Sequence, residues 1–170
     1  ENILTVTRIS EETGTISKTP EAAEEIISEA VMKFRRRYDV PVEITIPDEL
    51  MLIPMDAILI EQVIVNLLEN SVLHGKTTTL IKLTLSSDGE NAVFSVTDNG
   101  SGINEKKLPM LFSGYFIHAE EQSGDVKRNM GIGLSVCLTI IKAHGGTMTA
   151  GNLPEGGAEF TFTLPLERAL

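Results

Sequence analysis

The feature that most constrains how this chain folds is an alternating apolar run that ends in an acid and two glycines. Residues 92–96 (AVFSV) place Ala92, Phe94 and Val96 on one face of a strand, and residues 98–102 (DNGSG) follow almost directly. A carboxylate at a strand end, beside glycine backbone that a flat ligand can approach, suits a hydrogen bond from an exocyclic amine such as that of adenine. For this segment taken alone, a plain hairpin or loop is the alternative interpretation.

Hydrophobic periodicity and turn residues predict the remaining elements. Thr19, Pro20 and Glu21 offer an N-cap, a proline at the first helical position and an acid in the first turn. Helices are predicted at 20–37, 55–73, 108–112 and 133–143. Strands are predicted at 42–46, 78–86, 91–97, 147–151 and 158–164. The order of elements predicts a two-layer α/β (α+β) sandwich, in which helices cover one face of a mixed sheet.

Three finer features accompany this fold prediction. The polar segment 113–130 has no strong period and is expected to be a mobile loop. His144 precedes two glycines and is expected to cap the C-terminus of helix 133–143. Gly156 and Gly157 are expected to form a hairpin turn between the last two strands.

Composition excludes several classes of protein. A net charge of -10 and a pI near 4.7 argue against a nucleic-acid surface, which needs a clustered basic face. The one basic run, at 35–37, is interpreted as a solvated helix end. The single cysteine, Cys137, excludes an intramolecular disulfide and is expected at a packed helix position. We find no apolar run approaching the roughly 20 residues of a membrane helix, so any membrane anchor is expected in other parts of a parent protein.

Three further segments stand in a fixed order around Asp98. They are residues 66–70 (NLLEN), 129–134 (NMGIGL) and 155–160 (EGGAEF). In this order the four segments resemble the catalytic, ATP-binding domain of sensor histidine kinases. That family belongs to a superfamily that also contains type II topoisomerases, a heat-shock chaperone and mismatch-repair ATPases. The resemblance covers about residues 20–166, and the closing run 144–166 is most similar to the potassium-responsive sensor kinases of bacteria.

The resemblance also implies a domain organisation. Residues 1–15 would be the C-terminal tail of the dimerisation helix that carries the phosphoacceptor, and residues 16–168 the catalytic domain. The chain has three histidines, His74, His118 and His144, and none lies in an N-terminal helix followed by an acid. The histidine that accepts the phosphoryl group is therefore expected outside this chain.

Asn66 and Asn70 are expected to share one face of the helix 55–73, because they are four residues apart. An amide oxygen is a good ligand for magnesium, although two surface amides would have the same spacing. The resemblance assigns the Mg2+ ligand to Asn70. It places Asn66 where the ATP hydrolases of the superfamily have a glutamate that activates water. An amide cannot be that base, so the catalytic pair Asn66 and Asn70 favours phosphoryl transfer to a protein. Glu69 is expected to point away from the site.

The resemblance assigns the adenine pocket to residues around Asp98. Asp98 would accept from the adenine amine, Gly100 and Gly102 would shape the turn, Ile103 would pack beneath the base, and His74 would lie near the pocket.

The segment 131–134 is the expected phosphate site. Gly131 and Gly133 are predicted at the start of a helix, where free backbone N–H groups favour an anion. Ile132 and Leu134 belong to the same nucleotide-binding segment. A tight turn between loop and helix is the alternative.

The chain departs from the sensor-kinase pattern at two main places. Leu73 stands where a phosphate-binding lysine is usual. The expected mobile loop 113–130 corresponds to the ATP lid of the family, and Asn129 stands where the glycine run of the lid usually begins. Lys76, or Lys127 and Arg128 in the lid, would have to supply the missing charge. An aromatic group that opens the lid is matched by Phe112, Tyr115 and Phe116.

The function predicted from the sequence is that of the ATP-binding domain of a two-component sensor kinase, with ATP and Mg2+ as cofactors. It would transfer the γ-phosphoryl to a histidine on its own dimerisation domain, for relay to an aspartate on a response regulator. The domain would be cytoplasmic, and its parent protein anchored in the inner membrane. Two alternatives stay open, a non-catalytic nucleotide-sensing module and an anti-sigma-type serine kinase.

Overall fold

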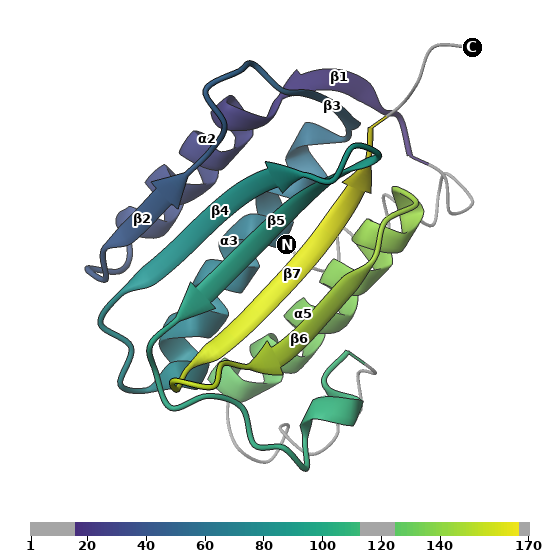
Figure 1. Ribbon diagram of the computed structural model, residues 1–170. Helices are drawn as coiled ribbons and strands as arrows, with labels where there is room; N and C mark the ends of the chain where they lie inside the picture. Colours follow the sequence, from purple (N-terminus) through teal and green to yellow (C-terminus); the bar gives the residue numbers. More distant parts are fainter. Residues whose placement is uncertain (1–15, 113–124, 167–170) are drawn as a thin grey trace.

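The structure is a computed structural model that describes residues 16–112 and 125–166, with the side chains of 125–132 outside the described part. Its main sheet has five strands in the order β2-β4-β5-β7-β6. These are β2 (Val42–Thr45), β4 (Ile81–Ser87), β5 (Asn91–Asp98), β6 (Met148–Asn152) and β7 (Ala158–Pro165). Three helices, α2 (Ala23–Arg35), α3 (Ala57–Gly75) and α5 (Asp125–Ala143), lie behind the sheet as seen in Figure 1. The predicted two-layer sandwich is confirmed.

The sheet is mixed, as expected. β2 runs parallel to β4, and the other neighbours are antiparallel. On the inner face, Phe94 of β5 lies opposite Phe162 of β7, and their rings stack with centroids 4.5 Å apart. Both side chains are at most 1 % exposed. The alternation seen at 92–96 therefore reports a strand with one face in the core.

The outer face of the sheet carries a row of hydroxyl groups. Thr84, Ser95, Thr161 and Thr149 lie opposite one another on β4, β5, β7 and β6, and we call them the hydroxyl row. Ser95 and Thr161 share a hydrogen bond of 3.3 Å. No described helix covers this face (Figure 1).

The helix α3 is the apolar centre of the second layer. Asp56 caps its first turn, where Oδ1 accepts from the Leu59 N–H at 3.3 Å. By length and composition alone α3 passes the test for a membrane span, a feature that we missed in the sequence. In the structure α3 packs between α2 and α5, and nine of its residues are buried. Packing in the core explains its apolar composition without a membrane.

The predicted helix start at Pro20 is wrong. Residues 19–22 form the strand β1 (Thr19–Ala22), which pairs antiparallel with β3 (Leu52–Met55). Helix α2 begins only at Ala23, whose N–H donates to the carbonyl of Met51 at 3.0 Å. The Met51 carbonyl, just before β3, thus satisfies an N–H group that would otherwise need a helix cap, and proline is tolerated in such a two-stranded edge.

The helix predicted at 133–143 begins earlier, at Asp125. The expected loop 113–130 therefore divides into residues 113–124, which lie outside the described part, and a helical remainder. The predicted helix at 108–112 is a shorter 3-10 turn, η1 (Leu108–Met110).

The C-terminus of α5 ends as predicted, with His144 as the capping residue. The N–H groups of Gly145 and Gly146 donate to the carbonyls of Lys142 and Ile141, both at 2.9 Å, and Gly145 has a positive φ of 82°. The imidazole is buried. Its Nδ1 donates to the Ile140 carbonyl at 2.8 Å, and its Nε2 accepts the Asp56 N–H at 3.0 Å. His144 thereby joins the end of α5 to the start of α3, and burial lowers its pKa.

The basic run at the end of α2 is exposed, as expected of a solvated helix end. Two basic side chains near this end nevertheless bind α3. Lys33 pairs with Glu61, and Arg37 Nη1 lies 3.2 Å from Glu69 Oε2. The second pair directs the Glu69 carboxylate toward α2, which agrees with the expectation that Glu69 is not a catalytic base.

Candidate functional site

The candidate site lies at one end of the sheet, where α3, β5 and β6 end and β7 begins (Figure 1). Three hydrogen bonds connect these elements. The Ser101 N–H donates to the Gly75 carbonyl at 2.9 Å, and the Ala158 N–H donates to Asp98 Oδ1 at 3.3 Å. The Ile103 N–H donates to Asn152 Oδ1 at 2.7 Å. The loop after β5 is thus fixed between α3 and the β6–β7 hairpin.

Asp98 is a buried acid in a fixed position. It is 5 % exposed, and its Oδ1 accepts from two backbone N–H groups, those of Gly100 (2.8 Å) and Ala158. Its Oδ2 has no hydrogen-bond partner among the described residues. The carboxylate is therefore oriented through one oxygen while the other is available to a ligand donor.

Gly75 and Gly100 allow α3 and the loop after β5 to touch. A Cβ at Gly100 would lie 2.8 Å from the Cα and the carbonyl oxygen of Gly75. A Cβ at either glycine would also overlap the hydroxyl of Thr78, which donates to the Ser71 carbonyl at 2.7 Å. Close packing, more than turn formation, requires these two glycines.

Gly102 and Ile103 continue the loop. Gly102 has a φ of 83°, so its glycine is required by backbone conformation. Ile103 is 4 % exposed and belongs to the hydrophobic core. Its burial agrees with an apolar residue at the floor of a pocket.

The predicted hairpin turn at Gly156 and Gly157 is present, since the Gly156 N–H donates to the Leu153 carbonyl at 3.0 Å and the Leu153 N–H to the Gly157 carbonyl at 2.9 Å. Gly157 has a second role that we missed in the sequence. A Cβ at Gly157 would overlap the carbonyl oxygen of Asp98. The neighbouring Ala158 N–H, also missed, holds the Asp98 carboxylate. A glycine pair before a strand was the only sequence signal for this contact.

Asn70 is the most unusual polar group of the site. It is 4 % exposed, and its Nδ2 is a buried atom without a hydrogen-bond partner in the described part of the chain. Such an atom costs about 1–3 kcal/mol. Since the two ends of an amide have nearly the same shape, a half-turn of the side chain puts the oxygen at this position. The site thus contains an amide that suits a bound ligand, and with its oxygen presented, a cation.

Asn66 lies against α5. Its Nδ2 donates to Cys137 Sγ at 3.6 Å, and a Cβ at Gly133 would lie 3.7 Å from its amide. Cys137 is fully buried, as predicted, and burial raises the pKa of its thiol to about 12. The structure therefore brings together Asn66 and Gly133, which the sequence placed in different motifs.

Comparison with known proteins identifies the family. The family described as histidine kinase-, DNA gyrase B-, and HSP90-like ATPase matches residues 55–168. The chain belongs to this family. The match includes α3, the loop after β5, α5 and the β6–β7 hairpin, which are the elements that build the candidate site.

Individual histidine kinases are also similar. The sensor protein KdpD of Clostridium acetobutylicum is 36 % identical over 168 residues, covering 98 % of this chain and 19 % of that protein. The sensor protein KdpD of Escherichia coli is 33 % identical, covering 99 % and 18 %. The chain thus spans about a fifth of the length of these curated relatives. The solved catalytic domain of the histidine kinase ThkA is 27 % identical with a TM-score of 0.74, covering 89 % of this chain and 97 % of that one.

In this histidine kinase-type ATPase domain, the expected helix start at Gly131 and Gly133 is wrong. Both glycines lie inside α5, which begins at Asp125, so their N–H groups are not among the first four of the helix. The residues from 125 to 130 include no proline, and they continue the helix. Leu134 is 4 % exposed and packs in the core, whereas the side chain of Ile132 is outside the described part.

The remaining predicted residues of the ATPase domain lie at the end of α3. Leu73 and His74 are partly buried in its last turn. Lys76 follows, exposed and with a φ of 62°, in a three-residue turn closed by the Thr77 N–H on the Gly75 carbonyl at 2.5 Å.

Other expectations fall on the lid. Phe112 is partly buried against the core, and Tyr115 and Phe116 lie outside the described residues. The side chains of Lys127 and Arg128 are also outside them.

Proposed function

We propose that this chain is the kinase domain of a sensor protein and transfers the γ-phosphoryl of ATP to a histidine on the dimerisation domain of the same protein. The observation that carries the proposal is that two buried polar side chains of the candidate site, Asp98 and Asn70, each have an atom available to a ligand. Asp98 is oriented through Oδ1, and the buried Nδ2 of Asn70 has no hydrogen-bond partner in the described part of the chain. An acid suited to the adenine amine and an amide suited to a cation near phosphates are both needed to bind magnesium ATP.

The residues present fit a magnesium ion. Asn70 would hold it through its amide oxygen, and the ion would neutralise phosphate charge when bound. Among the described residues, no group of three or more His, Cys, Asp or Glu side chains forms a metal site. This fits an ion held mostly by the nucleotide and water, with one protein amide.

Transfer to a protein is favoured over hydrolysis by the environment of Asn66. Its amide Nδ2 donates to Cys137 on α5, and an amide is not basic enough to accept a proton from water. The chain would act by positioning ATP so that an incoming imidazole nitrogen attacks the γ-phosphorus while the bond to the β-phosphate oxygen breaks and ADP leaves. The phosphoryl group would then pass to an aspartate of a response regulator.

The base contacts of His74, Gly100, Gly102 and Ile103 belong to this proposal, as does a cytoplasmic placement in a membrane-anchored parent. Phosphate contacts at Gly131, Ile132, Gly133 and Leu134 are part of it on the family resemblance alone, because these residues lie inside α5 and not at its start. One alternative is a nucleotide-sensing module without catalysis, which Leu73 and Asn129 favour. A serine kinase of the anti-sigma type is opposed by Asn66.

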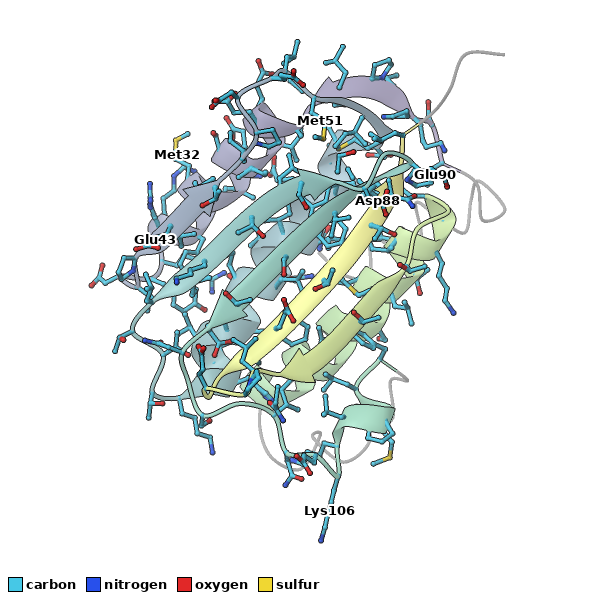
Figure 2. All side chains as sticks on the ribbon, viewed as in Figure 1. Met32, Glu43, Met51, Asp88, Glu90 and Lys106 are labelled. Carbon is cyan, nitrogen blue, oxygen red and sulfur yellow. The ribbon has the colours of Figure 1, made fainter. Side chains whose placement is uncertain are left out.

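Calorimetric titration with ATP and ADP, with and without Mg2+, tests nucleotide binding. We expect Asp98→Asn to weaken both nucleotides and Asn70→Ala to weaken mainly the magnesium complexes. Asp88→Asn is the matched control, because Asp88 lies in the β4–β5 turn at the opposite end of the sheet (Figure 2), where it accepts the Asn91 N–H at 2.7 Å. If the wild-type chain binds neither nucleotide, the proposal is wrong.

Incubation with labelled ATP and a supplied histidine-bearing dimerisation domain tests transfer. Acid-labile label on that domain would support the kinase. Binding without transfer to any such domain would favour the sensing module.

A further inference from the structure

Asn152 joins the end of β6 to the loop that follows Asp98. Its Oδ1 accepts the Ile103 N–H at 2.7 Å, and its Nδ2 donates to the Ile103 carbonyl oxygen at 2.8 Å. One side chain therefore pairs both polar groups of one backbone residue, as a neighbouring strand would do. This double contact fixes the position and also the orientation of Ile103.

The loop is shaped to accept this side chain. At Gly102 the backbone has a φ of 83°, and a Cβ there would lie 2.8 Å from Asn152 Oδ1. A larger residue at 102 would press on the amide oxygen. Gly102 thus serves the contact between loop and hairpin in addition to the turn.

The same hairpin holds the other end of the loop. Ala158, which is opposite Asn152 in the β6–β7 ladder, donates its N–H to Asp98 Oδ1. Gly157 lies directly against the Asp98 carbonyl. One rung of the ladder therefore fixes both Asp98 and Ile103, and with them the segment between these residues.

We propose that Asn152 is a positioning residue for nucleotide binding, which holds Ile103 at a fixed place relative to Asp98. The inference rests on the proposed function, because it takes Asp98 and Ile103 as the contacts of the adenine base. Asn152 is itself exposed, so its bonds contribute little to the stability of the whole domain and much to the order of one loop. Since the contact lies at the base, it affects ATP and ADP alike.

The test compares ATP and ADP affinity, by calorimetry with excess Mg2+, for the wild type and three variants. Asn152→Ala removes both hydrogen bonds, and we expect about tenfold weaker binding of both nucleotides. Asn152→Asp keeps the acceptor but places a charged oxygen against the Ile103 carbonyl oxygen, so it is expected to bind no better than the alanine variant. Asn104→Ala is the control and is expected to bind as the wild type does, because Asn104 is exposed and, in the described part of the chain, its side chain bonds only to the nearby Lys106 N–H.

Two further measurements separate positioning from a general loss of structure. Hydrogen exchange of the Ile103 amide is expected to be faster in Asn152→Ala than in the wild type. The midpoint of thermal unfolding of this variant should stay within a few degrees of the wild-type value. Equal affinity of Asn152→Ala and wild type would overturn the inference, as would weaker ATP binding with unchanged ADP binding or unfolding below the assay temperature. A wild-type chain that binds neither nucleotide would overturn the proposed function, and with it this inference.

Discussion

The contact of Gly157 with Asp98 gives the sharpest prediction, because its neighbour Gly156 is a natural control. Both glycines have a positive φ, 100° and 107°, so an alanine at either place is strained by about 1–2 kcal/mol. The space around them differs. A Cβ at Gly156 would meet nothing within 4 Å, whereas a Cβ at Gly157 would overlap the carbonyl oxygen of Asp98.

The alanine at 157 has to displace the Asp98 carbonyl oxygen by about 1.5 Å to reach ordinary contact distance. The hydrogen bond from the Ala158 N–H to Asp98 is already 3.3 Å long and does not survive such a shift. We expect Gly157→Ala to be about 1–3 kcal/mol less stable than Gly156→Ala, from overpacking alone. Loss of a correctly placed carboxylate should also weaken ATP binding by roughly tenfold to a hundredfold.

Urea unfolding and ATP titration of both variants, at the same pH and temperature, measure these differences. Gly156→Ala should bind ATP as the wild type does. The reasoning is refuted if the two variants have equal stability and equal affinity, because the close approach to Asp98 would then have no consequence.

Three further predictions concern the helical layer. The pKa of His144 is lowered in the folded chain, so the stability that it contributes is present above its ordinary pKa of 6.5 and is lost as the pH falls through the folded value. The urea midpoints at pH 7.5 and pH 5.5 should therefore differ more in the wild type than in His144→Gln. Equal differences in the two proteins would contradict this. Cys137 is buried with a pKa of about 12, so Ellman's reagent at pH 8 should label it only in denaturant, and rapid labelling of the native chain would disprove its burial. Arg37→Ala should cost less than about 1 kcal/mol in urea unfolding, because Arg37 pairs with Glu69 near the surface, and a larger loss would show that this ion pair matters more than its exposure implies.

Much of the fold was predictable because its signals are local. Alternation at 92–96, the apolar length of α3 and the glycines after His144 each determine an element from neighbouring residues alone. The start of α2 was not predictable in this way. The residues around Pro20 fit a helix start and the strand β1 equally well. The pairing of Thr19 with Met55, which is distant in the sequence, decides for the strand.

The residues of the candidate site also divide into those that a local motif predicts and those that depend on contacts distant in the sequence. Asp98 and Asn70 were predictable as chemical groups from their motifs. The structure orients the Asp98 carboxylate and leaves Asn70 Nδ2 without a partner among the described residues. The residues that position this loop were not predictable, since Asn152 contacts Ile103, 49 residues earlier in the sequence, and Gly157 contacts Asp98, which is still more distant. Gly131 and Gly133 misled the prediction because glycine lowers helix propensity without forbidding a helix.

The hydroxyl row explains why the outer face of the sheet needs no covering layer. An apolar outer face would require a third layer to cover it. Threonine keeps the β-branched shape that strands favour, and its hydroxyl both donates and accepts, so neighbours such as Ser95 and Thr161 satisfy one another or bind water. The sheet therefore gains strand-forming side chains while the hydroxyl row stays polar, and such a row does not offer the apolar surface on which a second sheet packs.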